Sequence, residues 1–315
     1  MLSMESSQPT LAAVVRERTG ATWSRARKLC EEGRVSVDGE RCLDPAARVP
    51  LDAVVVIDEH APKVRRGPLA ESAIVYFDAD VVVVEKPAGM LSVADEEGNP
   101  DTFVNHARTV VRRLDKHGKD SALGVVHRLD KETSGVMVFA RTASALRSLA
   151  EQFRAREMDR IYQAIVHGEA GARRVQTELV EDRGDGLRGS FGHFRRPRGG
   201  PPSDAKRAVT NIAPIETLRG ATLVECRLET GRQHQIRIHL SELGHPLLGE
   251  RIYIRDYKAT PIEAPRLMLH AKQLGFVHPR TGAKMSFERE APADFQAMLE
   301  KLAVTSAGRG AGSSG

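Results

Sequence analysis

The sequence predicts an α+β protein in two parts, a small helix-and-hairpin module followed by a larger domain on a mixed, mainly antiparallel sheet. The chain has 315 residues, enough for about two domains with proper cores. In its larger part, short β-rich segments outnumber helical ones and do not alternate regularly with them, which disfavours a doubly wound fold. Residues 58–70, rich in proline and glycine, read as a linker between the parts.

The first part, residues 10–57, begins with two short helices. Leu11 and Val15 fall on the apolar face of a helix that ends at Gly20. Thr22 is suited to cap a second helix, because a threonine side chain accepts a hydrogen bond from the first turn. The apolar side of this second helix carries Ala26, Leu29 and Cys30.

A hairpin completes this part. The segment from Arg34 alternates in polarity and turns at Asp38-Gly39, a strong hairpin signal. Residues 53–57 form a last apolar strand. Basic residues surround the second helix, but such a face is more often simply solvated than used to bind phosphate. The residues of this part that could contact phosphate are Arg25, Arg27, Lys28 and Arg34.

The larger part, residues 71–304, is expected to hold mainly strands. Two helices interrupt them, one capped by Thr142 and one with Ile236 and Leu240 on its inner face. Residues 305–315 are rich in glycine, serine and alanine and are expected to form a disordered tail. The expected strands are residues 74–77, 81–85, 135–140, 161–166, 221–228, 267–271 and 285–290.

Composition narrows the class of protein. No apolar run is long enough to span a membrane, and three cysteines without a CxxC pair disfavour a disulfide framework and a structural zinc site. We therefore expect a cytoplasmic protein with reduced thiols. The net charge of 47 − 42 = +5 is compatible with a nucleic-acid partner.

One segment, residues 183–207, carries as much excess charge as the whole chain, with seven basic and two acidic residues. Its many glycines and prolines predict a long, mobile, basic loop. Such a loop is either an electrostatic arm for a polyanion or a solvated insertion, and the sequence leaves both open. The candidate polyanion contacts within it are Arg195, Arg196 and Arg198.

The first stretch that suggests chemistry surrounds Asp130. This aspartate lies between Arg128 and Lys131, just before Ser134-Gly135 and a predicted strand. Neighbouring cations favour the ionised carboxylate, which is able to act as a nucleophile, a general base or a metal ligand. An arbitrary aspartate is more often part of a surface ion pair.

The second stretch is residues 229–240. A helix that starts near residue 233 buries Ile236 and Leu240 and puts His234 and Arg237 on another face. The histidines of this region do not have the spacing of a metal site, and no H-E-x-x-H pattern is present. We therefore expect no metal. The histidines concerned are His234, His239 and His245.

Several motifs together resemble known families. Ser24-Arg25, residues 33–39 and the strand that closes at Ile57 make residues 10–57 resemble the S4 RNA-binding domain. The larger part resembles the RluA-type RNA pseudouridine synthases along nearly its whole length. The motifs that carry this second resemblance are Lys86-Pro87-Ala88-Gly89, residues 127–135, 162–168, 230–237, 244–249 and 267–271.

The resemblance implies an enzyme that detaches uracil from ribose in RNA, rotates it and rejoins it through carbon 5, without metal or cofactor. It implies that Asp130 is the essential aspartate, that Arg237 forms an ion pair with it, and that Tyr162 is the active-site tyrosine. Leu269 would pack against the base. Arg128 and His127 would bind the flipped nucleotide. Two departures from the usual family pattern, Glu85 and Arg160, leave these positions intact.

The sequence thus favours a monomeric uridine isomerase that acts on structured RNA, most of all large-subunit (23S) ribosomal RNA. A tRNA-directed pseudouridine synthase is an alternative substrate assignment. A non-catalytic RNA-binding or ribosome-assembly factor is an alternative of another class, which the set of Asp130, Tyr162 and Arg237 disfavours. A hydrolase of small N-glycosides is a third, but it would need a partner carboxylate.

Overall fold

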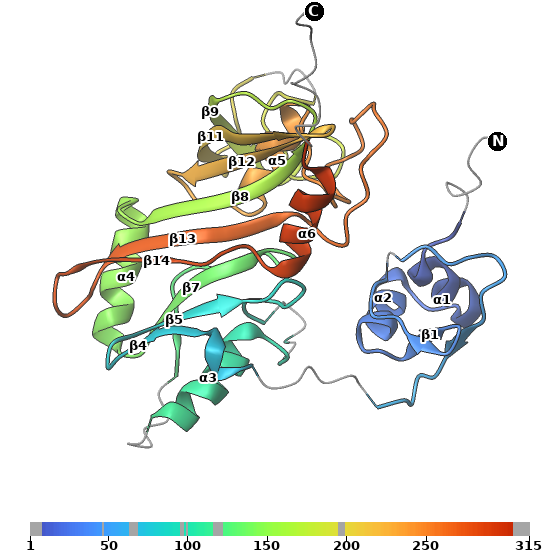
Figure 1. Ribbon diagram of the computed structural model, residues 1–315, viewed down its shortest axis with the longest axis horizontal. Helices are drawn as coiled ribbons and strands as arrows, with labels where there is room; N and C mark the ends of the chain where they lie inside the picture. Colours follow the sequence, from blue (N-terminus) through green and yellow to red (C-terminus); the bar gives the residue numbers. More distant parts are fainter. Residues whose placement is uncertain are drawn as a thin grey trace, which may run out of the picture. The chain divides into compact units, whose positions relative to one another are not determined.

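The structure, a computed structural model, describes residues 8–45, 47–62, 69–94, 98, 100–115, 122–194 and 199–304. The chain forms two compact units, residues 1–68 and 69–315 (Figure 1). None of the helices described is long and apolar enough to cross a membrane. The predicted tail, residues 305–315, lies outside the described residues.

The first unit has the predicted order of two helices and a hairpin. Thr22 accepts a hydrogen bond from the backbone N–H of Arg25, and Gly20 ends the first helix in the left-handed conformation, with φ of 69°. Leu11 and Leu29 are fully buried between the helices and the small sheet. The sheet has the strand order β2-β1-β3 and is antiparallel. The elements are α1 (Leu11–Thr19), α2 (Trp23–Glu31), β1 (Val35–Val37), β2 (Glu40–Arg41) and β3 (Val55–Ile57).

The second unit is built on one eleven-stranded sheet, which confirms the predicted fold class. Its strand order is β10-β9-β11-β12-β8-β13-β7-β5-β4, with β14 beside β13 and β6 beside β7. The pairing of β13 with β7 is parallel and the other printed pairings are antiparallel. The strands are β4 (Ile74–Phe77), β5 (Val81–Lys86), β6 (Gly124–Val125), β7 (Ser134–Ala140), β8 (Asp159–His167), β9 (Arg173–Val180), β10 (Gly189–Ser190), β11 (Lys206–Leu218), β12 (Ala221–Leu228), β13 (Leu269–Val277) and β14 (Lys284–Glu288). The helices are a short 3-10 turn (Glu71–Ala73), α3 (Phe103–Leu114), α4 (Ala143–Ala155), α5 (Gln235–Glu242) and α6 (Ala293–Leu302).

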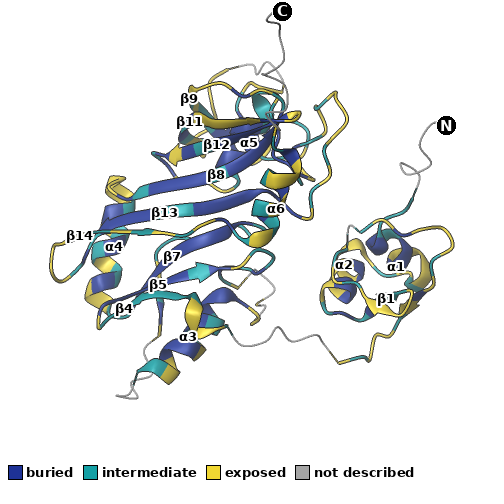
Figure 2. Cartoon of the chain, in the orientation of Figure 1, coloured by how far each residue is buried: buried dark blue, intermediate teal, exposed yellow. Residues whose placement is uncertain are grey.

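Helices on both faces explain why β5 and β7 are continuous apolar runs. In β7, Met137 and Phe139 point into the same cluster as Phe103 of α3, while Val136 and Val138 join Leu149 of α4 on the other face. Successive strand residues alternate between faces, so both faces need apolar side chains here. Figure 2 shows β7 in dark blue, and β5 lies between it and the edge strand β4. They form a rigid base for the loop that precedes β7.

The structure has more elements than the sequence predicted. The two helices expected in the larger part are α4 and α5, but α3 and α6 were missed. Strands β9 and β11 were also missed, because β9 is largely exposed and polar and β11 contains Pro214 at a register shift. Apolar alternation therefore gave too little signal at that side of the sheet.

The segment 183–207 is not one mobile loop, which corrects the prediction. It contains β10 and the start of β11. Arg183 is buried and forms ion pairs with Asp185 and Asp256, so this cation is used inside the protein. Gly189 permits the fold, because a Cβ there would lie 2.3 Å from Cδ of Arg183. The predicted RNA contacts Arg195, Arg196 and Arg198 lie outside the described residues.

Candidate active site

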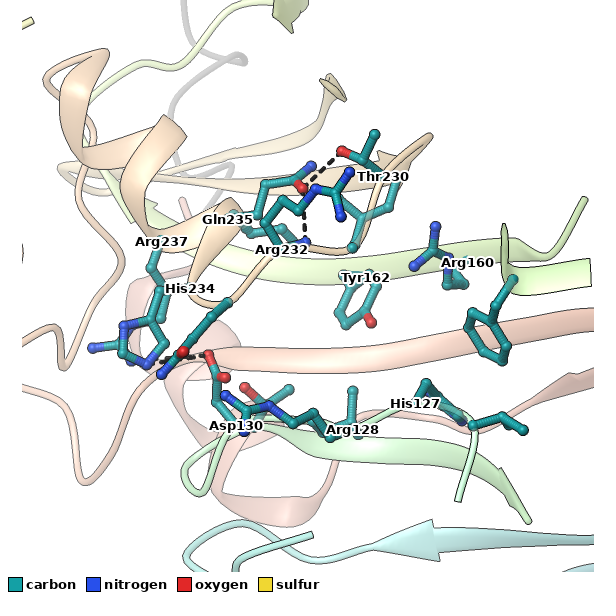
Figure 3. A pocket seen from close by; sticks show the side chains of 18 of the residues that line it. His127, Arg128, Asp130, Arg160, Tyr162, Thr230, Arg232, His234, Gln235 and Arg237 are labelled. Atoms are coloured by element: carbon teal, nitrogen blue, oxygen red, sulfur yellow. Dashed lines mark hydrogen bonds and ion pairs between the residues drawn. The ribbon is translucent and has the colours of Figure 1, made fainter. Parts of the chain in front are cut away.

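A cavity of about 790 Å³ opens over the middle of the large sheet. Its walls come from the loop before β7, from β8 and from the loop before α5 (Figure 3). These segments are far apart in the sequence, yet the structure brings together all six residues predicted for catalysis and substrate binding. They are His127, Arg128, Asp130, Tyr162, Arg237 and Leu269.

Asp130 lies on a loop that two buried side chains hold by its backbone. Ser92 donates a hydrogen bond to the carbonyl of Leu129 (2.6 Å) and accepts one from its N–H (3.0 Å). The ammonium of Lys86 donates to the carbonyls of Lys131 (3.0 Å) and Thr133 (2.8 Å). Backbone groups on both sides of Asp130 are therefore fixed, and the carboxylate is presented from a rigid loop. Sequence reasoning found the motif that contains Lys86 but missed the function of its side chain.

A tight contact behind the loop explains Gly135. Its φ is +124°, and a Cβ there would lie 2.2 Å from the carbonyl oxygen of Ala271. Only glycine allows β13 to approach β7 this closely. Leu269, two residues before Ala271 on the same strand, is thereby brought to the pocket wall.

Arg237 is held mainly by an acid that the sequence did not reveal. Its Nε and Nη2 donate to the carboxylate of Glu250 at 2.7 and 2.6 Å, a bidentate pair. Burial alone would raise the pKa of Glu250, but the hydrogen bonds and charge of Arg237 lower it below its ordinary value. Glu250 also accepts from the backbone N–H of Arg251 and Ile252. This network fixes the plane of the guanidinium.

Asp130 faces Arg237 and His234. Its Oδ2 lies 3.9 Å from Nη1 of Arg237 and 3.9 Å from Nε2 of His234 (Figure 3). The predicted ion pair is thus present, as a longer contact than the one between Arg237 and Glu250. His234 has a left-handed backbone, with φ of 57°, and its Nδ1 lies 2.8 Å from the hydroxyl of Tyr253. Burial lowers the pKa of His234, although Asp130 acts in the opposite direction. We call Asp130, His234 and Arg237, together with Glu250 behind Arg237, the reactive end of the pocket.

Tyr162 stands on β8 in the centre of the sheet, opposite Ala271 of β13 and Cys226 of β12. It is 9% exposed. Burial raises the pKa of its phenol, with Arg160 lowering it and Asp130 raising it. The ring is therefore neutral at physiological pH and offers an apolar face to a planar ligand.

His127 lies at the other side of Tyr162 from Asp130 (Figure 3). Its Nε2 accepts a hydrogen bond from the N–H of Val138 (3.1 Å), and its ring stacks on Phe153 at 4.8 Å between centroids. Burial and the nearby charge of Arg160 lower its pKa to about 3. His127 is thus a neutral ring with its proton on Nδ1. We call His127, Phe153 and Arg160 the basic end of the pocket.

The predicted basic residues of the first unit lie on α2 and just after it. Arg25, Arg27 and Lys28 are exposed. Arg25 pairs with Glu59 at 2.8 Å, and Arg34 pairs with Glu32 at 2.9 Å. Arg25 and Arg34 therefore have acidic partners within the unit.

The three histidines considered for a metal make separate contacts. Nδ1 of His239 lies 2.9 Å from the hydroxyl of Thr210, and Nδ1 of His245 lies 2.9 Å from the carbonyl of His167. Elsewhere, among the described residues, one group of Asp78, Asp80 and His278 has ligand-type atoms within 4.8 Å of one another. These acids are engaged with neighbouring side chains, such as His278 with Asp78 at 2.7 Å.

A mixed sheet with an aspartate, an arginine and a tyrosine in one central pocket defines the class of enzyme that the sequence motifs suggested. Residues 80–242 match the RNA pseudouridylate synthase family, and residues 11–55 match the S4 domain. The chain belongs to the RNA pseudouridylate synthase family and is an RNA pseudouridine synthase of the RluA type with an N-terminal S4 RNA-binding domain.

Two curated relatives and one solved structure illustrate the similarity. Ribosomal large subunit pseudouridine synthase D of Zymomonas mobilis is 36% identical over 294 residues, which cover 89% of each chain. The protein of the same name from Pseudomonas aeruginosa is 34% identical over 89% of this chain and 87% of its own. The structure of human RNA pseudouridylate synthase domain containing 4 is 26% identical, covers 73% of this chain and 93% of its own, and superposes with a TM-score of 0.59.

Proposed function

We propose that the enzyme converts one or a few uridines of 23S ribosomal RNA to pseudouridine. Relatives named as large-subunit pseudouridine synthases, similar over nearly the full chain, support this substrate. The observation that carries the reaction is the carboxylate of Asp130, which faces a fixed guanidinium, Arg237, in a pocket over the sheet.

In the proposed reaction Asp130 assists cleavage of the bond between N1 of uracil and C1′ of ribose. The uracil rotates and C5 bonds to C1′. The proton then leaves C5, and N1, freed from the sugar, takes up a proton, so that the product has the mass of the substrate. Arg237 orients Asp130 electrostatically. Tyr162 contacts the face of the uracil, and Leu269 packs against it from the neighbouring strand. These roles allow Asp130 to act on the sugar or on the base.

The target nucleotide must leave its helix, because the glycosidic bond is not accessible in a stacked duplex, and extrusion costs a few kcal/mol. In the proposal, Arg128 and His127 position the extruded nucleotide at the mouth of the pocket. Contacts from Arg25, Arg27, Lys28 and Arg34 of residues 10–57 to phosphates offset part of the cost. The same role is proposed for Arg195, Arg196 and Arg198.

The proposal includes action in the cytoplasm, as a monomer and without a metal or organic cofactor. It also includes the boundaries of the catalytic domain, residues 71–304. The reaction needs no metal and no organic cofactor, because uridine isomerisation involves no net oxidation and exchanges only protons with its surroundings.

The test is a map of pseudouridine in ribosomal and transfer RNA from a strain that lacks the enzyme. The strain is then complemented with the wild type and with Asp130→Asn. We expect positions in 23S rRNA to revert to uridine and only the wild type to restore them. Loss of sites in transfer RNA alone would reject the 23S assignment. An unchanged map with disturbed ribosome assembly would favour a non-catalytic role.

A further inference from the structure

Arg160, at the basic end of the pocket, has a charge for which the described residues supply no counter-charge. The residue is 8% exposed and lines the same cavity as Asp130. Its Nε has no hydrogen-bond partner, and within the described parts of the chain no carboxylate forms an ion pair with it. Burial lowers its pKa. A buried unpaired cation is costly, so this one calls for a partner outside the described protein groups.

The surroundings of Arg160 offer hydrogen-bond donors and apolar surface. Its guanidinium lies 5.6 Å from the ring centroid of Phe153, the ring on which His127 also stacks. Because Nε2 of His127 accepts from Val138, its Nδ1 carries the proton and is a donor. Such a site suits a ligand with acceptors only.

The exposed wall of the pocket is basic as well. Arg128, Arg156 and Arg232 are exposed and line the same cavity. Tyr162 lies between Arg160 and Asp130 (Figure 3), and both charges act on its phenol. When the reacting uridine of an RNA lies at Asp130 and Tyr162, the sugar-phosphate backbone next to that uridine would therefore lie near Arg160.

We propose that Arg160 is a binding residue for one phosphate of the RNA strand, next to the extruded uridine. This inference rests on the proposed function and extends it by naming a backbone subsite. A phosphate fits better than a uracil carbonyl, because only an anion compensates the buried charge, and a guanidinium matches phosphate with two parallel hydrogen bonds.

The first experiment compares wild type with Arg160→Met, which keeps an unbranched apolar stem and removes the charged guanidinium. The binding probe is single-stranded oligouridylate, so the result does not depend on which ribosomal RNA is the target. We expect affinity to fall about ten- to hundredfold, as for a lost charged hydrogen bond. The slope of log affinity against log salt should become shallower by about 0.7, the value for one phosphate on a single strand.

Steady-state kinetics on a 23S rRNA transcript then separates binding from chemistry. KM should rise by a similar factor while kcat at saturating RNA stays within about threefold, and Arg160→Lys should recover part of the affinity. If the wild type does not modify the transcript, the 23S assignment fails, whereas the oligouridylate result still decides the role of Arg160.

A second variant moves the guanidinium without removing it. A Cβ at Gly231 would lie 2.4 Å from Nη1 of Arg160, and this glycine does not have a positive φ. Gly231→Ala should therefore displace the guanidinium and weaken oligouridylate binding, in a background where Arg160 is intact. In Arg160→Met the same substitution should have little further effect, since the two changes act on one contact.

Thermal unfolding distinguishes a binding role from a structural one. Arg160→Met should leave the free protein as stable as the wild type or more stable, because an unpaired buried charge is removed. Arg147→Met, an exposed arginine of α4 outside the pocket, is the matched control and should change neither binding nor stability. An unchanged salt slope with weaker binding would assign Arg160 to a uracil carbonyl and overturn the proposal. Unchanged binding with lost stability would also overturn it.

Discussion

The two ends of the pocket treat buried charge in opposite ways. At the reactive end, Arg237 is held by two short hydrogen bonds to Glu250 and faces Asp130 at 3.9 Å. At the basic end, Arg160 is equally buried but has no acidic partner among the described residues. A cation that the protein neutralises is fixed in orientation, whereas a cation that it leaves unpaired is available to a ligand. The comparison therefore separates a group that orients the chemistry from one that binds substrate.

Asp130→Asn gives the largest expected effect. The amide lacks the charge and the basicity of the carboxylate, so kcat should fall by about 10⁴-fold or more. The oligouridylate affinity of the variant should stay close to wild type, because the basic end is unaltered. Release of tritium from carbon 5 of labelled uridine in RNA measures the reaction directly. A variant with full activity would remove Asp130 from the catalytic role.

Glu250→Gln should destabilise the protein by removing the anionic partner of Arg237. It leaves Arg237 buried with a neutral partner, and breaking a buried pair from one side costs about 3–5 kcal/mol of unfolding free energy. Urea unfolding measures the loss. The double variant Arg237→Gln with Glu250→Gln should regain part of the stability, because no unpaired charge remains, but not the activity. If the double variant is the less stable one, the pair is not coupled as described.

Lys86→Met tests the support of the catalytic loop. The ammonium holds the carbonyls of Lys131 and Thr133, so its loss leaves acceptors unpaired in the interior and should cost about 2–3 kcal/mol. Faster hydrogen exchange of residues 129–133 should accompany lower kcat. Lys284→Met, on the exposed edge of β14, is the control. Wild-type exchange in Lys86→Met would show that the loop does not depend on this lysine.

The effect of His127 on stability is absent at neutral pH and appears only in acid. The pKa of His127 is about 3 in the folded protein and about 6.5 in the unfolded chain. Between these values the unfolded chain binds the proton and the folded protein does not, so stability is complete above pH 6.5 and falls as the pH falls towards 3. His127→Gln should make this dependence shallower by up to one proton. Part of the pH dependence should remain in the variant, because burial also lowers the pKa of His239, to about 4. An unaltered pH profile would contradict the assignment to His127.

The sequence led to the reactive residues but not to the groups that position them. Asp130, Tyr162 and Arg237 stand in ordered motifs whose spacing is readable along the chain. Ser92 and Lys86 contact the catalytic loop across 37 and 45 positions of sequence. Single polar residues at such separations leave no local pattern, and so their functions were invisible before the fold was known.

The basic segment shows the opposite error. Composition alone predicted that residues 183–207 form a long, mobile loop, yet Arg183 is buried against three acids and Gly189 lies in a strand. Charge and glycine content indicate how unfavourable it is for a segment to become ordered in isolation. They do not include the partners that the rest of the chain brings to it.

By itself, the sequence determined the two-part architecture, the apolar strands and the chemical groups of the reaction, because periodicity, turn residues and motif order are local properties of the chain. Only the tertiary structure decided which charges are neutralised. Glu250 and Arg160 are both polar residues near apolar strands in the sequence. Glu250 is enclosed with a counter-ion, whereas Arg160 has none among the residues that the structure describes. The burial and ion pairing of a side chain depend on which residues distant segments bring next to it. They decide that Arg237 orients the carboxylate of Asp130, whereas Arg160 is left to bind a phosphate.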